Sequence, residues 1–126
     1  MNGETAMNGK RRILVVDDDP AVRAYVRAAL EHAGYDVTTA RDGYEAISRI
    51  AASDYDVVLL DVTLPRLDGV EVVEHFSKEN NPVLAHTYLL TPASPQEYGE
   101  LPVCGVIGKP FDIRALLAEA KDCIGH

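Results

Sequence analysis

The sequence predicts an α/β fold in which a doubly wound parallel sheet of five strands carries helices on both faces. Short apolar runs alternate along the chain with amphipathic segments, which is typical of strand–helix–strand units with right-handed crossovers. The run 57–60 is apolar at every position, as expected of a strand buried on both sides. Several such runs end on charged residues, and parallel sheets bind ligands at the carboxyl ends of their strands.

Composition and charge narrow the possible functions. The 126 residues are 47% apolar, which is enough for one domain with a core. The net charge of −8 argues against nucleic acid as a direct partner, because phosphate binding needs a basic surface. No apolar run approaches the length of a membrane span and the first nine residues are polar, so we expect a cytoplasmic protein without a membrane partner.

The two cysteines and four histidines do not form a sequence motif. Cys104 and Cys123 lack CxxC spacing, so they fit buried or inert thiols of a reducing compartment better than a metal or redox pair. The histidines are scattered without ligand spacing. No zinc site is therefore expected.

The first half of the chain is expected to begin with a flexible tail over residues 1–10, followed by one domain over residues 11–126. A strand over 13–16 ends in Asp17, Asp18 and Asp19, and Asp19 with Pro20 has the pattern of a helix N-cap. Gly34 ends this helix. A strand over 35–40, a helix after Asp42 and the strand over 57–60 complete this half.

The second half repeats the alternation less regularly. A helix is expected from about Val70 to Phe76, a fourth strand from Val83 to about Thr87, a fifth over 103–107, and a last helix capped by Asp112. The segment 91–99 should hold the fourth helix. Pro95 and Gly99 interrupt it, so that helix is expected to be short or distorted.

Charged residues collect at one edge of the predicted sheet. Asp17 and Asp18 follow the first strand, Asp61 ends the third, and Lys109 follows the fifth. Crowded carboxylates repel one another, which raises their pKa values unless a cation neutralises them. Mg²⁺ is a hard cation that prefers oxygen ligands. No glycine-rich phosphate loop or dinucleotide fingerprint is present, so nucleotide binding is poorly supported.

Three stretches together resemble the receiver domain of two-component response regulators, the chemotaxis-regulator type included. These are residues 13–20 (ILVVDDDP), residues 59–69 (LLDVTLPRLDG) and Lys109-Pro110-Phe111, and the resemblance runs from about Arg12 to Ile124. It implies a flavodoxin-like fold with strand order 2-1-3-4-5.

The resemblance also implies a role for each site residue. Asp61 would be the phosphoacceptor, attacking a phosphohistidine of a sensor histidine kinase or phosphotransfer protein. Mg²⁺ would be held by Asp18, Asp61 and the backbone carbonyl of Thr63, with Asp17 acting largely through water. Lys109 would contact a phosphoryl oxygen, and the Lys109–Pro110 bond would be cis.

The family also has a hydroxyl at the end of strand four, which could be Thr87 or Thr91. Thr87 is favoured because its separation in sequence from Pro82 and from Lys109 resembles the spacing that is usual in the family. Tyr88 would then follow it and either cover the crevice, slowing loss of phosphate, or pack outward. The family's aromatic switch position is Val106 here, so an aromatic rotation at that site cannot report phosphorylation.

The expected function is a phosphoryl-accepting receiver that signals to a downstream protein and is not an enzyme beyond its own phosphorylation and dephosphorylation. The chain stops after the last helix, which suggests a stand-alone receiver; a fragment of a longer regulator would look the same. One alternative is a receiver-like adaptor that does not use phosphate. A less favoured one is a small Asp-nucleophile phosphatase, which would need an Asp two residues after Asp61, where Thr63 stands.

Overall fold

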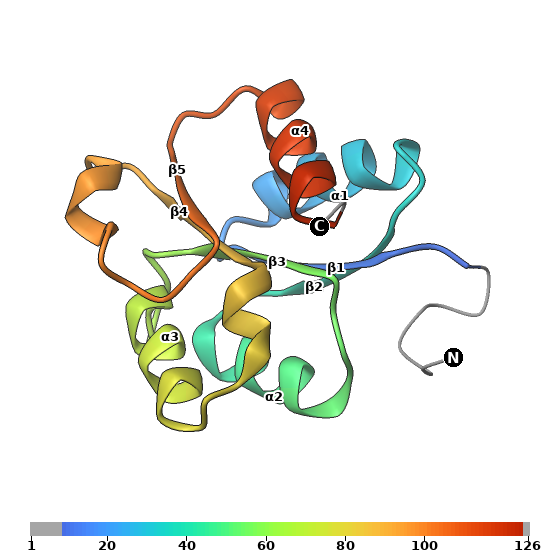
Figure 1. Ribbon diagram of the computed structural model, residues 1–126. Helices are drawn as coiled ribbons and strands as arrows, with labels where there is room; N and C mark the ends of the chain where they lie inside the picture. Colours follow the sequence, from blue (N-terminus) through green and yellow to red (C-terminus); the bar gives the residue numbers. More distant parts are fainter. Residues whose placement is uncertain (1–8, 125–126) are drawn as a thin grey trace.

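The protein folds as a five-stranded parallel sheet between two layers of helices (Figure 1), as predicted. The computed structural model describes residues 9–124, so the tail expected over residues 1–10 lies mostly outside the described residues. The strand order is β2-β1-β3-β4-β5. The strands and α-helices are β1 (Arg12–Val16), α1 (Pro20–His32), β2 (Asp36–Ala40), α2 (Gly43–Ala52), β3 (Val57–Asp61), α3 (Gly69–Lys78), β4 (Thr87–Thr91), β5 (Gly105–Gly108) and α4 (Ile113–Ile124).

The core lies on both faces of the sheet because successive side chains of a strand point to opposite sides. Leu14, Val58 and Leu60 pack toward α2 and α3, whereas Ile13 and Leu59 pack toward α1 and α4. Figure 1 shows the two pairs of helices on opposite sides of the sheet. All five residues of β3 are buried, as its apolar sequence predicts, since it lies between β1 and β4.

Aspartates begin three helices, and their side chains accept hydrogen bonds from orphan backbone N–H groups in the first turn. Asp19 caps α1, Asp42 caps α2, and Asp68 forms a capping box with Glu71 at the start of α3. The prediction that Asp19 and Pro20 begin a helix is confirmed. These caps matter for the site because α1 and α3 begin next to the ends of β1 and β3.

The fourth strand differs from the prediction. Residues Pro82–His86 form a 3-10 helix, η1, and the strand is Thr87–Thr91 instead of 83–87. The physical reason is local: the Asn81 side chain accepts a hydrogen bond from the Val83 N–H at 2.9 Å and caps a turn, and Pro82 is well suited to the first position of such a turn. The apolar run therefore enters the sheet one turn later than expected.

The expected fourth α-helix is replaced by a single 3-10 turn, η2 (Pro95–Tyr98). Within residues 9–124 the chain thus has four α-helices instead of five, in line with the prediction that this helix is short or distorted. Proline and glycine explain the outcome, since both disfavour a helix interior.

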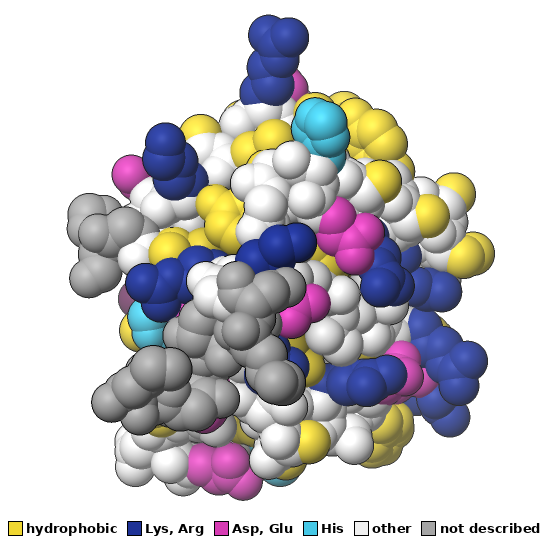
Figure 2. Space-filling view, turned by 90° about the vertical axis from the view of Figure 1, so that its right-hand side faces the viewer, with side chains coloured by type: hydrophobic (Ala, Val, Ile, Leu, Met, Phe, Trp, Pro, Cys, Tyr) yellow, Lys and Arg dark blue, Asp and Glu magenta, His cyan; other side chains and the backbone are white. Residues whose placement is uncertain are grey.

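The edge of the sheet at which the strands begin faces the viewer in Figure 2. Lys and Arg side chains are spread over this edge beside acidic side chains. Arg11 belongs to this edge and lies 3.5 Å from the Asp56 carboxylate. In the part of the chain that the structure describes, no helix has the length and apolar character needed to cross a membrane.

Candidate phosphoacceptor site

The carboxyl ends of β1 and β3 bring three carboxylates together. One carboxylate oxygen from each of Asp17, Asp18 and Asp61 lies within 4.8 Å of the other two. Asp17 and Asp61 are 2% and 3% exposed, whereas Asp18 is exposed to solvent. We call these three residues with Lys109 the carboxylate site. The expectation that these four residues lie at one edge of the sheet is confirmed.

Lys109 supplies the positive charge of the carboxylate site. Its Nζ lies 3.0 Å from Asp17 Oδ2 and 3.1 Å from Asp61 Oδ2. Lys109 follows β5, and its backbone N–H donates to the carbonyl of Thr91 at 2.7 Å, which holds it beside the end of β4. The Lys109–Pro110 bond is cis, as expected. One flexible ammonium thus offsets only part of the negative charge of two buried carboxylates.

Burial and charge act against each other on the acid–base properties of the site. Burial is the largest influence on Asp61 and raises its pKa; the hydrogen bond and charge of Lys109 only partly offset this, and the charge of Asp17 adds to it. For Lys109, burial acts to lower the pKa, but the hydrogen bonds to Asp17 and Asp61 leave it raised on balance. Additional positive charge near Asp61 would therefore stabilise the ionised form of its carboxylate.

Local backbone contacts fix the orientation of the carboxylates. Asp17 Oδ1 accepts from the Asp19 N–H at 2.9 Å, and Asp61 Oδ1 accepts from the Thr63 N–H at 3.2 Å. Each aspartate thus bonds the backbone two residues further on, as Asp often does in turns. Both carboxylates keep an oxygen directed to Lys109.

Gly69 allows α3 to begin directly against the end of β3. A Cβ atom added at Gly69 would lie 2.4 Å from the carbonyl oxygen of Asp61 and 2.8 Å from Cα of Val62. The Gly69 N–H donates to the carbonyl of Val62 at 2.9 Å. The position of the Asp61 backbone therefore depends on a residue without a side chain.

The structure does not bring Thr87 to the carboxylate site. Thr87 begins β4 and pairs with Val58, while its hydroxyl donates to the carbonyl of Val83 at 2.8 Å. Thr91 ends β4, next to the residue pair Asp61 and Leu90. The preference for Thr87 over Thr91 therefore has to be corrected, because strand four begins where the sequence predicted that it would end.

Tyr88 likewise lies away from the site. It is 5% exposed and packs in the core on the side of α1 and α4. Neither expectation for Tyr88 holds, because it is the second residue of β4 and not the residue after its end. The residue after Thr91 is Pro92, which lines the hollow over the carboxylates.

That hollow has a volume of about 250 Å³ and is lined by Asp17, Asp18, Asp19, Val22, Asp61, Thr63, Pro92 and Lys109. Pro92 and Val22 were not predicted there. Val22 stands in the first turns of α1, which starts at this edge, so helix geometry could have placed it. Pro92 could be found only with the correct bounds of β4.

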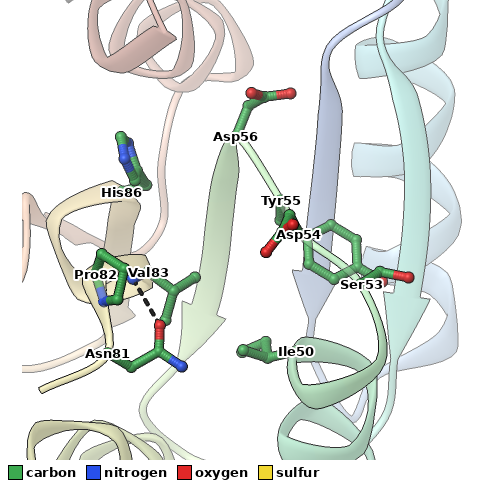
Figure 3. Close-up of a pocket in the computed structure, with 9 residues that line it drawn as sticks. All are labelled: Ile50, Ser53, Asp54, Tyr55, Asp56, Asn81, Pro82, Val83 and His86. Carbon is green, nitrogen blue, oxygen red and sulfur yellow. Dashed lines mark hydrogen bonds between the residues drawn. The ribbon is translucent and has the colours of Figure 1, made fainter. Parts of the chain in front are cut away.

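A second hollow, of about 220 Å³, lies at the opposite edge of the sheet, between the residues before β3 and those before β4 (Figure 3). Its lining includes two carboxylates, Asp54 and Asp56. Asp56 already accepts from the Arg12 N–H at 2.7 Å. This hollow is separated from the carboxylate site by the full length of β3, which starts at Val57 and ends at Asp61.

Val106, the expected switch position, is half-buried on β5 and pairs with Leu89. It packs against the core on the side of α2 and α3, near Tyr98 and Leu101. Residue 106 is valine, so this position carries no aromatic side chain.

Comparison with known proteins agrees with this geometry. Residues 13–121 match the family described as response regulator receiver domain. The chain is 35% identical over 116 residues to the alkaline phosphatase synthesis transcriptional regulatory protein PhoP of Bacillus subtilis; the match covers 88% of this chain and 47% of PhoP. The chain thus spans about half the length of that relative.

The solved structures that resemble the fold include two response regulator structures. The receiver domain of Francisella response regulator 1452 has a TM-score of 0.87 and 27% identity, over 92% of this chain and 98% of that one. The response regulator TrrA from Thermotoga maritima, in complex with Mg²⁺-BeF, has a TM-score of 0.78 and 32% identity, over 90% of this chain and 98% of that one.

Proposed function

Because the chain belongs to the response regulator receiver domain family, we propose that Asp61 accepts a phosphoryl group from a phosphohistidine of a sensor histidine kinase or a phosphotransfer protein. The observation that carries the proposal is the position of Asp61 at the end of β3, with Lys109 Nζ 3.1 Å from its carboxylate. The family implies the kinase as partner. The phosphorylated form would signal to a downstream protein.

The transfer follows from the chemistry of the two groups. A carboxylate oxygen of Asp61 attacks phosphorus, the phosphorus–nitrogen bond to the donor imidazole breaks, and the electron pair stays with the imidazole, which takes up a proton. The product is an aspartyl phosphate. Catalysis of such a transfer consists mainly of positioning and of offsetting charge.

The donor set fits Mg²⁺, because three carboxylates supply oxygen ligands at one point. Asp18, Asp61 and the carbonyl of Thr63 would hold the ion, with Asp17 acting largely through water. Bound there, Mg²⁺ supplies positive charge that offsets the negative charge of the phosphoryl oxygens.

Lys109 and Thr91 would contact the transferred group. Lys109 now bonds two carboxylates, and its flexible stem allows the ammonium to turn to a phosphoryl oxygen. Thr91 replaces Thr87 in this role, because it ends β4 beside Lys109. The Thr91 hydroxyl oxygen accepts from the Ala93 N–H at 3.0 Å, which leaves its proton available for a phosphoryl oxygen.

Phosphorylation by acetyl phosphate with Mg²⁺, followed by intact mass, tests the proposal. The wild-type chain should gain one phosphoryl group and Asp61→Asn none. The matched control is Asp54→Asn, an exposed carboxylate at the other edge, which should label as the wild type does. Labelling of Asp61→Asn at the wild-type rate would refute the assignment, and no labelling of the wild type would favour the phosphate-independent adaptor.

The two threonines are separated by a second pair of variants. Thr91→Val should slow labelling about ten- to a hundredfold, because a hydrogen bond to a charged group is worth about 1.5–3 kcal/mol and each factor of ten corresponds to about 1.4 kcal/mol. Thr87→Val removes an equivalent hydroxyl that bonds only the Val83 carbonyl, so the labelling rate of the folded variant should not change. Equal rates for both variants would remove Thr91 from the site.

A further inference from the structure

The two cysteines, which the sequence suggests are unrelated, both contact the short segment at the start of β4. The Cys104 N–H donates to the carbonyl of Thr87 at 2.8 Å. The Cys123 sulfur lies 3.9 Å from Nδ1 of His86. His86 and Thr87 are consecutive, so the start of β5 and the last turn of α4 meet at the same point.

Tyr88 is a second residue at the start of β4 that lies near both cysteines. Tyr88 pairs with Gly105, the neighbour of Cys104, and its ring covers that glycine so closely that an added Cβ would lie 2.7 Å from Cε1. Cys123 packs with Tyr88 in the core cluster beside α4. Tyr88 thus lies next to the backbone that follows Cys104 and in the same core cluster as Cys123.

The electrostatic environment agrees with a close pair. Burial raises the pKa of Cys123 to about 12, and a hydrogen bond and charge interaction with Cys104 add to the increase. Burial also raises the pKa of Tyr88, again with contributions from Cys104. Cys104 thus interacts with both groups.

The two thiols differ in access to solvent. Cys104 is exposed, whereas Cys123 is 6% exposed. A small oxidant can therefore reach Cys104, whereas the surrounding residues shield Cys123 from it. His86 is exposed in η1. Figure 3 shows its ring at the rim of the second hollow, on the far side from Ile50.

We propose that Cys104 and Cys123 are a thiol-modification site at which a hydroperoxide forms an intramolecular disulfide. The Cys104 thiol gives its proton to solvent, and the thiolate attacks the terminal peroxide oxygen. The O–O bond breaks, and the leaving oxygen takes up a proton from solvent and departs as an alcohol or water, so that Cys104 becomes a sulfenic acid. The Cys123 sulfur then attacks the Cys104 sulfur and the S–O bond breaks. The Cys123 proton passes by way of His86 Nδ1 to the departing hydroxide, which leaves as water. Two thiols lose two electrons and two protons, and the hydroperoxide is reduced.

The location sets this site apart from the carboxylate site. Cys104 contacts the first residue of β4, Thr87, whereas Asp61 pairs with Leu90 near its other end. The disulfide would tie the start of β5 to the last turn of α4. The proposal therefore does not depend on phosphorylation of Asp61.

The test treats the reduced full-length chain with hydrogen peroxide and measures intact mass and non-reducing peptide maps. The wild type should lose two hydrogens without dimerising, and its map should show one peptide joining Cys104 to Cys123. Cys123→Ser should stop at a sulfenic acid on Cys104 that dimedone traps, and Cys104→Ser should keep an unmodified Cys123. Each serine variant is the matched control for the other.

A variant at His86 tests the proton transfer separately. His86→Gln should slow closure of the disulfide severalfold and leave the first oxidation of Cys104 unchanged, because only the second step uses Nδ1. Wild type that gives only Cys104-linked dimers or over-oxidised Cys104, with Cys123 still a free thiol, would overturn the proposal. So would equal oxidation of Cys123 in the wild type and in Cys104→Ser.

Discussion

Gly69→Ala should both destabilise the fold and disturb Asp61, the proposed phosphoacceptor. The new Cβ would lie 2.4 Å from the Asp61 carbonyl oxygen and 2.8 Å from Val62 Cα, where ordinary contact begins near 3.4 Å. Both atoms are backbone, so α3 or the end of β3 has to move by about 1 Å. Overpacking of this kind costs about 1–3 kcal/mol, and a displacement of about 1 Å at a reacting group can cost on the order of a hundredfold in rate.

Urea unfolding followed by circular dichroism measures the first effect, and labelling by acetyl phosphate measures the second. Gly99→Ala is the matched control, because its Cβ would meet only the Gln96 carbonyl oxygen at 3.5 Å and its φ of −65° suits alanine. The control should stay within about 0.5 kcal/mol of the wild type. If Gly69→Ala matches Gly99→Ala in both stability and labelling rate, α3 does not constrain Asp61 as described.

Three further predictions concern charge. Asp61→Asn should have a free energy of unfolding no lower than that of the wild type at pH 7, because burial raises the Asp61 pKa above 3.8 and the charged side chain therefore destabilises the fold at neutral pH. The difference in stability between the two proteins should vanish as the pH falls below 3.8. Lower stability of the variant at pH 7 would contradict this. Asp42→Ala should lower the free energy of unfolding by about 1 kcal/mol at pH 7, because it removes the cap of α2. The cap hydrogen bond from the Glu45 N–H, helped by Arg66, lowers the Asp42 pKa, so the stabilities of the two proteins in urea titrations should converge as the pH falls below 3.8. A difference in stability that does not change with pH would contradict a charged cap. Mg²⁺ at a hundred times its Kd should stabilise the wild type by about 2.7 kcal/mol, measured by thermal unfolding. At the same Mg²⁺ concentration Asp18→Ala should be stabilised less. Equal stabilisation of the two proteins would place the ion elsewhere.

The sequence by itself determined the layers of the fold and most of the carboxylate site. Asp17, Asp61 and Lys109 each stand directly at or after the end of a short apolar strand, and parallel strands end at one edge of a sheet. The helix starts at Asp19, Asp42 and Asp68 could also be predicted, because a cap depends on residues within one turn of it.

Only the tertiary structure decided which threonine ends strand four and whether the cysteines meet. The stretch 83–90 is largely apolar, so its pattern does not show where the strand begins; pairing with β3 and β5 sets Thr91 at the edge and leaves Thr87 at the start. Cys104 and Cys123 are 19 residues apart in sequence, and both come to the start of β4 because β5 pairs with β4 and α4 packs on the sheet. Local patterns determine contacts within a few residues, whereas register and helix packing depend on segments that are distant along the chain.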